Sequence, residues 1–214
     1  MCRRKGLISL GFTLIFAFAG RAQQWEVGGA GGLGKYHNAS VTSPAGTAGI
    51  GFATQAGGGL VIGENLYRWI GGEFRYTYRD GDLTVKSGGQ EGSLEGRAHA
   101  IHYDMLFHGA RKGSRFRPFA AAGAGIKVYQ GVGRESAFQP LSRFALLTKT
   151  DQVEPLISFG GGVKCLVSKH AQFRADFRDY VTPAPDRLFV PAARGKLQGW
   201  RHDFVPLVGV SYVF

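Results

Sequence analysis

The sequence contains little cysteine and no long apolar run after its first twenty residues. Its 214 residues include two cysteines, Cys2 and Cys165, and no CxxC pair, which excludes a disulfide framework and the usual zinc-binding patterns. The mean hydropathy of −0.08 excludes a polytopic helical membrane protein, because that class needs several apolar runs of about 20 residues.

Glycine, by contrast, is abundant. The chain has 34 glycines and 13% aromatic residues, and the usual share of glycine is about 7%. No G-X-Y period accompanies them, so collagen is excluded. Interior glycine costs a helix about 1 kcal/mol per site, and this composition therefore predicts a β-rich fold.

The first 22 residues are typical of a secretory signal peptide. Arg3, Arg4 and Lys5 precede the apolar stretch Gly6–Phe18, and small residues follow it up to Ala22. The stretch is short for a spanning helix, which needs about 17–25 residues; an uncleaved anchor is the alternative. We predict a signal peptide over 1–22 and one domain over 23–214.

The charge that remains after this segment is basic but scattered. Removing Arg3, Arg4, Lys5 and Arg21 leaves 22 basic and 15 acidic residues. No basic run exceeds two or three residues, which argues against a nucleic-acid partner.

Eight segments of the remaining chain alternate between apolar and polar residues with a period of two, as half-buried strands do. They cover residues 25–33, 48–62, 70–79, 93–107, 118–128, 153–167, 171–181 and 200–214. Short connections at 63–67, 109–115 and 168–170 alternate with long, polar ones at 37–47, 80–92, 131–152 and 182–199. This arrangement is typical of a transmembrane barrel with short periplasmic turns and longer extracellular loops.

Alternation alone also fits a soluble sandwich, in which the apolar face packs inward. Three features favour the barrel. The segments are longer than the usual five or six residues of soluble strands, aromatic residues such as Trp25, Trp69 and Tyr212 gather near their ends, and the polar face is mostly glycine, alanine and serine. We therefore predict an all-β, eight-stranded antiparallel transmembrane up-and-down barrel with its apolar side chains facing lipid.

The polar face then lines a narrow interior in which charges must pair, because an unpaired buried charge is very costly. The predicted interior charges are Glu26, Glu73, Arg75, Asp104, Lys127, Glu154, Lys164, Arg174, Asp176 and Arg178. Five are acidic and five basic, which favours a salt-bridged plug over a selective pore.

The last seven residues, Val208-Gly-Val-Ser-Tyr-Val-Phe214, carry a family resemblance. A terminal Phe with alternating apolar residues and an upstream aromatic resembles the C-terminal signature of small OmpA-like and OmpX-like outer-membrane barrels. The resemblance implies an outer-membrane location among its lipids and recognition of Phe214, Tyr212, Val210 and Val208 by the barrel-assembly machinery. We expect no peptidoglycan-binding domain after Phe214.

No catalytic or metal-binding pattern stands out. His99 and His102 lie three residues apart on a strand and so point to opposite faces, while His102 and Asp104 share one face and can pair. Gly29–Gly34 matches GxGxxG but sits in a predicted strand, so it is not a dinucleotide site. The segment 141–150 is apolar and is expected to be a short helix or a strand extension beyond the membrane, with a surface that touches a partner.

These observations predict a non-catalytic structural or surface-interaction protein without cofactor or metal, whose long loops bind an extracellular partner. A small passive pore and a lipid-modifying outer-membrane enzyme remain as alternatives.

Overall fold

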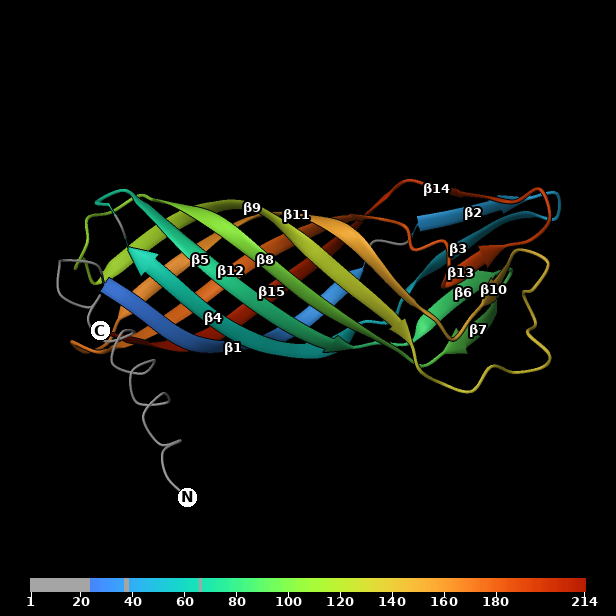
Figure 1. The fold of residues 1–214 in the computed structure, drawn as a ribbon, viewed down its shortest axis with the longest axis horizontal. Helices are drawn as coiled ribbons and strands as arrows, with labels where there is room; N and C mark the ends of the chain where they lie inside the picture. Colours follow the sequence, from blue (N-terminus) through green and yellow to red (C-terminus); the bar gives the residue numbers. More distant parts are fainter. Residues whose placement is uncertain (1–23, 37–38, 66) are drawn as a thin grey trace, which may run out of the picture.

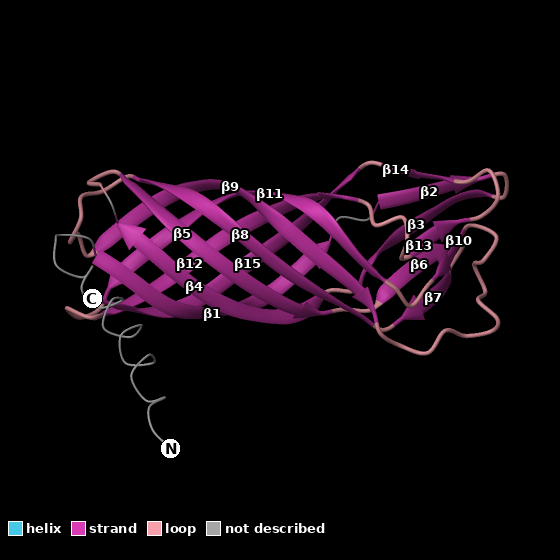
Figure 2. Ribbon diagram, in the orientation of Figure 1, coloured by secondary structure: helices cyan, strands magenta, loops and turns pink. Residues whose placement is uncertain are grey.

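The computed structural model describes residues 24–36, 39–65 and 67–214. The predicted signal peptide lies outside these residues. Within them the chain forms strands, turns and loops (Figure 2). No helix in this part of the chain is long and apolar enough to cross a bilayer.

Eight long strands close into a barrel, which confirms the predicted architecture. They are β1 (Gln24–Tyr36), β4 (Gln55–Asn65), β5 (Ile70–Asp80), β8 (Gly96–His108), β9 (Phe116–Gly131), β11 (Asp151–Leu166), β12 (Ala171–Pro183) and β15 (Trp200–Val213). All neighbours pair antiparallel, and β1 pairs with both β4 and β15. Closure leaves the barrel without a free edge, which hydrocarbon would not tolerate, because each unpaired backbone group costs several kcal/mol there.

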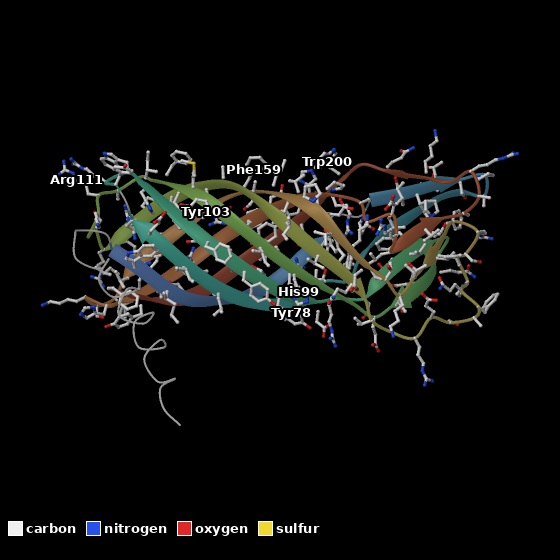
Figure 3. All side chains as sticks on the ribbon, viewed as in Figure 1. Tyr78, His99, Tyr103, Arg111, Phe159 and Trp200 are labelled. Carbon is white, nitrogen blue, oxygen red and sulfur yellow. The ribbon has the colours of Figure 1, made fainter. Side chains whose placement is uncertain are left out.

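The two faces of the barrel wall have the polarity that the sequence predicts. Large apolar side chains point outward, among them Phe74, Met105 and Phe159, which are 45%, 48% and 50% exposed. Figure 3 shows Phe159 projecting from the outer wall. Charged side chains point inward and are buried. The outer face is therefore suited to acyl chains, and the core of the barrel is polar.

The four long connections do not form open loops. They fold together into a second structure beyond one end of the barrel, here called the cap (Figure 1). Its five-stranded sheet consists of β14 (Lys196–Gln198), β2 (Ala39–Ser43), β3 (Gly46–Phe52), β6 (Leu83–Ser87) and β7 (Gln90–Leu94), and a second sheet pairs β10 (Ala145–Leu147) with β13 (Phe189–Pro191).

The cap has a large hydrophobic core, which also takes in Tyr36, Ala98 and Tyr129 from the adjoining ends of β1, β8 and β9. The core includes Val41, Ile50, Phe52, Leu83, Val85, Leu141, Phe144, Leu147, Leu188 and Phe189. Ile50, Leu83, Leu188 and Phe189 are completely buried. The predicted alternation of short and long connections is confirmed, but the prediction that the long ones are polar was wrong, because each contributes apolar residues to a shared core.

The prediction of one membrane strand over 48–62 was also wrong. The chain forms β3 in the cap and then, after Ala53 and Thr54, β4 in the barrel. Ile50 and Phe52 point into the cap core, whereas Leu60 is 62% exposed on the barrel wall. All three occupy even positions, so a single alternating pattern continues through two different environments.

The apolar segment 141–150 is neither a helix nor a strand extension of the barrel. It contains a turn followed by β10, and Leu141, Phe144 and Leu147 are 2–3% exposed. Most of its apolar side chains thus belong to the cap core, and Leu146 alone among its leucines is substantially exposed, at 42%.

Tight packing of the barrel wall leads to one prediction. A Cβ at Gly123 in β9 would collide with the backbone oxygen of Tyr103 and with the Asp104 carboxylate. We expect Gly123→Val to lower the folded fraction sharply, because closing β8 against β9 requires this approach. Gly92 in the cap, whose Cβ would meet nothing within 4 Å, provides the control: Gly92→Ala is expected to fold normally. The unboiled gel mobility of the refolded proteins measures both, and equal folding of the two variants would contradict the prediction.

Candidate functional site

The centre of the barrel holds a network of ionised side chains from both walls. Glu73 and Arg75 of β5 face Arg174 and Asp176 of β12 across the lumen. Arg75 reaches Glu73 Oε1 and Asp176 Oδ2 at 2.5 Å each, and Arg174 Nη2 lies 2.9 Å from Glu73 Oε2 and 2.8 Å from Asp176 Oδ2. Strands from opposite sides of the barrel are thus tied together by charge.

Further members extend this network along the lumen. Arg178 lies 3.2 Å from Asp104 Oδ2 and 3.4 Å from Glu73 Oε1. Lys164 pairs with Glu26 and lies 3.9 Å from Glu73. Four carboxylates and four cations therefore meet here, and charge is balanced within this group. Charge-assisted hydrogen bonds of this kind are about twice as strong as neutral ones.

A second, smaller cluster lies toward the cap. Asp203 of β15 accepts hydrogen bonds from Arg79 and, at 2.7 Å, from Lys127 Nζ. This cluster carries one positive charge more than it has negative charges. It separates the central network from the cap.

Arg201 is the side chain at the junction between barrel and cap. It is 1% exposed, and no hydrogen-bond acceptor contacts its guanidinium within the described part of the chain. Instead it lies over three aromatic rings, those of Phe52 at 4.6 Å, Tyr36 at 5.1 Å and Tyr129 at 5.5 Å. These cation–π contacts join β15 to the cap core, since Phe52 belongs to β3.

The structure brings together most of the predicted interior charges. Glu26, Glu73, Arg75, Asp104, Lys164, Arg174, Asp176 and Arg178 belong to the central network, and Lys127 pairs with Asp203. Glu154 does not join them. It is half-buried at the cap end of β11 and accepts a hydrogen bond from Gln152 at 2.5 Å, because β11 continues beyond the network before it meets the cap.

Sequence reasoning missed Arg79, Arg117, Arg201 and Asp203 as interior charges. Arg79 has the parity of Glu73 and Arg75 in its segment, and Arg117 has that of Lys127 in the same strand. Arg201 and Asp203 lie on the polar face of the last segment, from which no charge was predicted. Parity was therefore the signal that could have identified them.

His102 shows the predicted pairing with Asp104. Its Nδ1 lies 3.0 Å from Asp104 Oδ1, and its Nε2 lies 3.1 Å from the Tyr180 hydroxyl. His99 faces the other way, 2.9 Å from the Tyr76 hydroxyl. In the described ranges, no three His, Cys, Asp or Glu side chains are placed to hold a metal ion.

The central side chains leave no space for a water-filled passage at their level. Glu73, Arg75, Asp104, Arg174 and Arg178 are each 0–1% exposed, and an aqueous channel would leave part of their surface accessible to water. An eight-stranded barrel is wide enough only for its own side chains, and here those side chains are charged and mutually paired.

The C-terminal residues complete the closing strand at the end opposite the cap. Val208, Val210 and Tyr212 point outward and are 52–66% exposed. The Phe214 amide donates to the Trp25 carbonyl oxygen at 2.9 Å, and the Tyr212 and Phe214 rings meet at 5.1 Å. The last residue is thus held against the first barrel strand.

A closed eight-stranded barrel with an apolar exterior and a charged, paired interior defines the class of small outer-membrane barrels. A family model agrees: residues 9–214 match the outer membrane protein beta-barrel domain. The chain belongs to this family, which implies an outer-membrane location. The short-turn end, defined by the turns at 67–69, 109–115 and 167–170, then faces the periplasm, and the cap faces outward.

Solved structures with the same fold have very different sequences. Neisserial surface protein A matches with a TM-score of 0.53 at 11% identity, over 91% of this chain and 100% of that one. A major outer membrane protein from Thermus thermophilus gives 0.54 at 10% identity, over 91% and 100%, and the outer membrane protein AlkL gives 0.53 at 15%, over 92% of each. No curated protein sequence matches the chain.

Proposed function

We propose that this protein is a non-conducting, non-catalytic outer-membrane barrel that holds a folded cap at the cell surface for interaction with an extracellular partner. One observation carries the proposal: the four long connections share a hydrophobic core. A folded cap offers a defined surface. The conformational entropy of its segments is lost when the protein folds, so that binding a partner does not carry this cost again.

The cap also exposes apolar side chains, which supports a role in contact. Leu146 and Val190 are paired neighbours on the outer side of β10 and β13, 42% and 37% exposed. Phe138, in the connection that precedes β10, is 78% exposed. Aromatic and apolar side chains of this kind are typical anchors at protein interfaces.

The interior supports the non-conducting part of the proposal. A passive pore would need a wet lumen, whereas the central network is buried and paired. The proposed absence of catalysis has support from the placement of the histidines: His102 is occupied by Asp104 and Tyr180, and His170 and His202 hydrogen-bond the Val213 carbonyl oxygen and Asp179. Recognition of Phe214 and Tyr212 by the assembly machinery remains a proposal, supported by their exposure at the periplasmic end.

Two measurements test this function. We expect the refolded protein to show no discrete steady openings in a planar bilayer. We also expect a photo-crosslinking residue at Phe138, on intact cells in their native surroundings, to give a discrete adduct that the same residue at buried Leu147 or lipid-facing Phe159 does not give. Steady conductance together with no adduct at Phe138 would replace the proposal with a pore.

A further inference from the structure

The periplasmic turns have an unusually one-sided charge. The turns at 67–69, 109–115 and 167–170 contain Arg68, Arg111, Lys112, Arg115 and Lys169 and no acidic residue. Arg68, Arg111, Arg115 and Lys169 are exposed, and Lys112 is half-exposed. We call these five side chains the basic rim. Figure 3 shows Arg111 at this end of the barrel, away from the cap.

The cap has no such imbalance. Its four described segments, residues 39–54, 81–95, 132–150 and 184–199, together contain seven basic and five acidic residues. Opposite charges are mixed there, as in the 2.9 Å pair between Lys86 and Glu91. The uncompensated surface charge of the barrel is therefore concentrated at its periplasmic end.

Aromatic rings accompany the basic rim. The Arg68 guanidinium lies 5.2 Å from the centre of the Trp69 ring, and that of Arg115 lies 6.0 Å from the centre of the Phe116 ring. Trp69 is 47% exposed and Phe116 61% exposed. Aromatic residues with basic neighbours are typical of the boundary between hydrocarbon and headgroups, where the ring stays in the apolar layer and the cation reaches outward.

The rim directly adjoins the apolar belt. Outward-facing Ile70 follows Trp69 in the chain, and outward-facing Phe116 follows Arg115. At Arg68 and Arg115 no polar residue stands between the cation and the lipid-facing surface, which places these two charges at the depth of the headgroups rather than out in the periplasm. This depth favours a lipid over a soluble polymer as the partner.

A further cation, Arg117 of β9, lies close to the Lys112 side chain of the rim. The pKa of the Lys112 ammonium is lowered from its ordinary value, first by partial burial and second by repulsion from Arg117. Lys112 Nζ donates to the Asn65 carbonyl oxygen at 3.3 Å. The three turns themselves contain no acidic residue that could balance the rim cations.

We propose that the basic rim binds anionic phospholipid headgroups of the periplasmic leaflet and enriches such lipids around this end of the barrel. The contact is between the rim cations and headgroup phosphates, and Trp69 and Phe116 fix its depth. This inference concerns the periplasmic end and is independent of the function proposed for the cap.

Tryptophan quenching by brominated lipids tests the proposal on the full-length mature chain. The chain has three tryptophans; Trp25→Phe with Trp200→Phe leaves Trp69 as the reporter at the rim. In mixed vesicles of phosphatidylcholine and phosphatidylglycerol, with one or the other lipid brominated, we expect the local share of phosphatidylglycerol at Trp69 to exceed the bulk share about threefold at low salt and to fall toward it at high salt. A second reporter, Trp200 alone, lies at the cap end and is expected to sense the bulk composition.

Neutralised variants assign the effect to the rim. Changing Arg68, Arg111, Lys112, Arg115 and Lys169 to Gln is expected to bring the share at Trp69 down to the bulk value, whereas the matched cap set, with Lys86, Arg134, Lys149, Arg187 and Lys196 changed to Gln, leaves it unchanged. If the five-fold variant does not fold, as judged by gel mobility, R68Q with K169Q alone is expected to reduce the enrichment by about half.

Two results would overturn the proposal. One is a bulk lipid composition at Trp69 in the unaltered rim. The other is retention on purified peptidoglycan that the rim variant loses while phosphatidylglycerol enrichment at Trp69 is absent, since the rim would then serve the cell-wall polymer. Failure of the cap proposal would change neither readout.

Discussion

Replacing Glu73 with Gln is expected to destabilise the barrel by about 3–5 kcal/mol, because it leaves buried cations without their shared counter-charge. Glu73 lies within 4 Å of Arg75, Lys164, Arg174 and Arg178 and is completely buried. The remaining carboxylates, Glu26, Asp104 and Asp176, would then face one cation more than they can balance. The loss of stability is measured as a shift in the urea concentration at half-unfolding. The protein is unfolded in lipid vesicles, and the folded fraction is read from the gel mobility of unboiled samples.

Two further variants test whether the effect of Glu73→Gln arises from the buried network. Glu91→Gln breaks a solvent-exposed pair with Lys86, whose side chains are 53% and 48% exposed, and is expected to change stability by less than about 1 kcal/mol. Removing a cation as well, in E73Q with Arg75→Met, is expected to recover part of the stability, because charge balance returns. If E73Q unfolds at the same urea concentration as the unaltered protein, the network does not hold the barrel together.

Replacing Leu147 with Ala is expected to open the cap while the barrel stays closed. Leu147 is 3% exposed in the cap core, and such a truncation costs about 2–5 kcal/mol. The barrel keeps its own strand pairing, so the loss falls on the cap. A cost near 3 kcal/mol raises the open population, and with it the trypsin cleavage rate at Arg143 and Lys149, about a hundredfold.

The adjacent residue provides a matched control for this second experiment. Leu146 has the same side chain in the same strand but is 42% exposed, and Leu146→Ala is expected to leave cleavage almost unchanged. Mapping the tryptic fragments from vesicle-bound protein, together with heat-dependent gel mobility, separates opening of the cap from unfolding of the barrel. Equal cleavage of the two variants would mean that the cap has no cooperative core.

Much of the barrel could be predicted because lipid-facing and lumen-facing residues alternate along each strand of a membrane barrel. Ser158 and Phe159 illustrate this: the first is completely buried and the second 50% exposed, as their parity requires. The same rule placed Arg174, Asp176 and Arg178 inside. It would also have placed Arg79, Arg201 and Asp203 there, had it been applied to every residue of the polar face.

The pairing inside the lumen was beyond the reach of the pattern. Arg75 and Asp176 lie 101 residues apart in the chain and meet at 2.5 Å. Parity states that both point inward, but it carries no information on which opposite strand lies at the same height. The register of the strands and the closure of the barrel determine which side chains lie at the same height. They also place Glu154 outside the network.

The sequence by itself determined the number and direction of most barrel strands and the polarity of their faces, because lipid and a narrow interior impose opposite demands on neighbouring residues. Only the tertiary structure decided what the apolar faces meet. Ile50 and Leu60 have the same parity, yet one lies in a protein core and the other on the lipid-facing wall. Alternation shows that one face of a strand is removed from water. It does not distinguish burial in the core of a folded cap from burial in a bilayer.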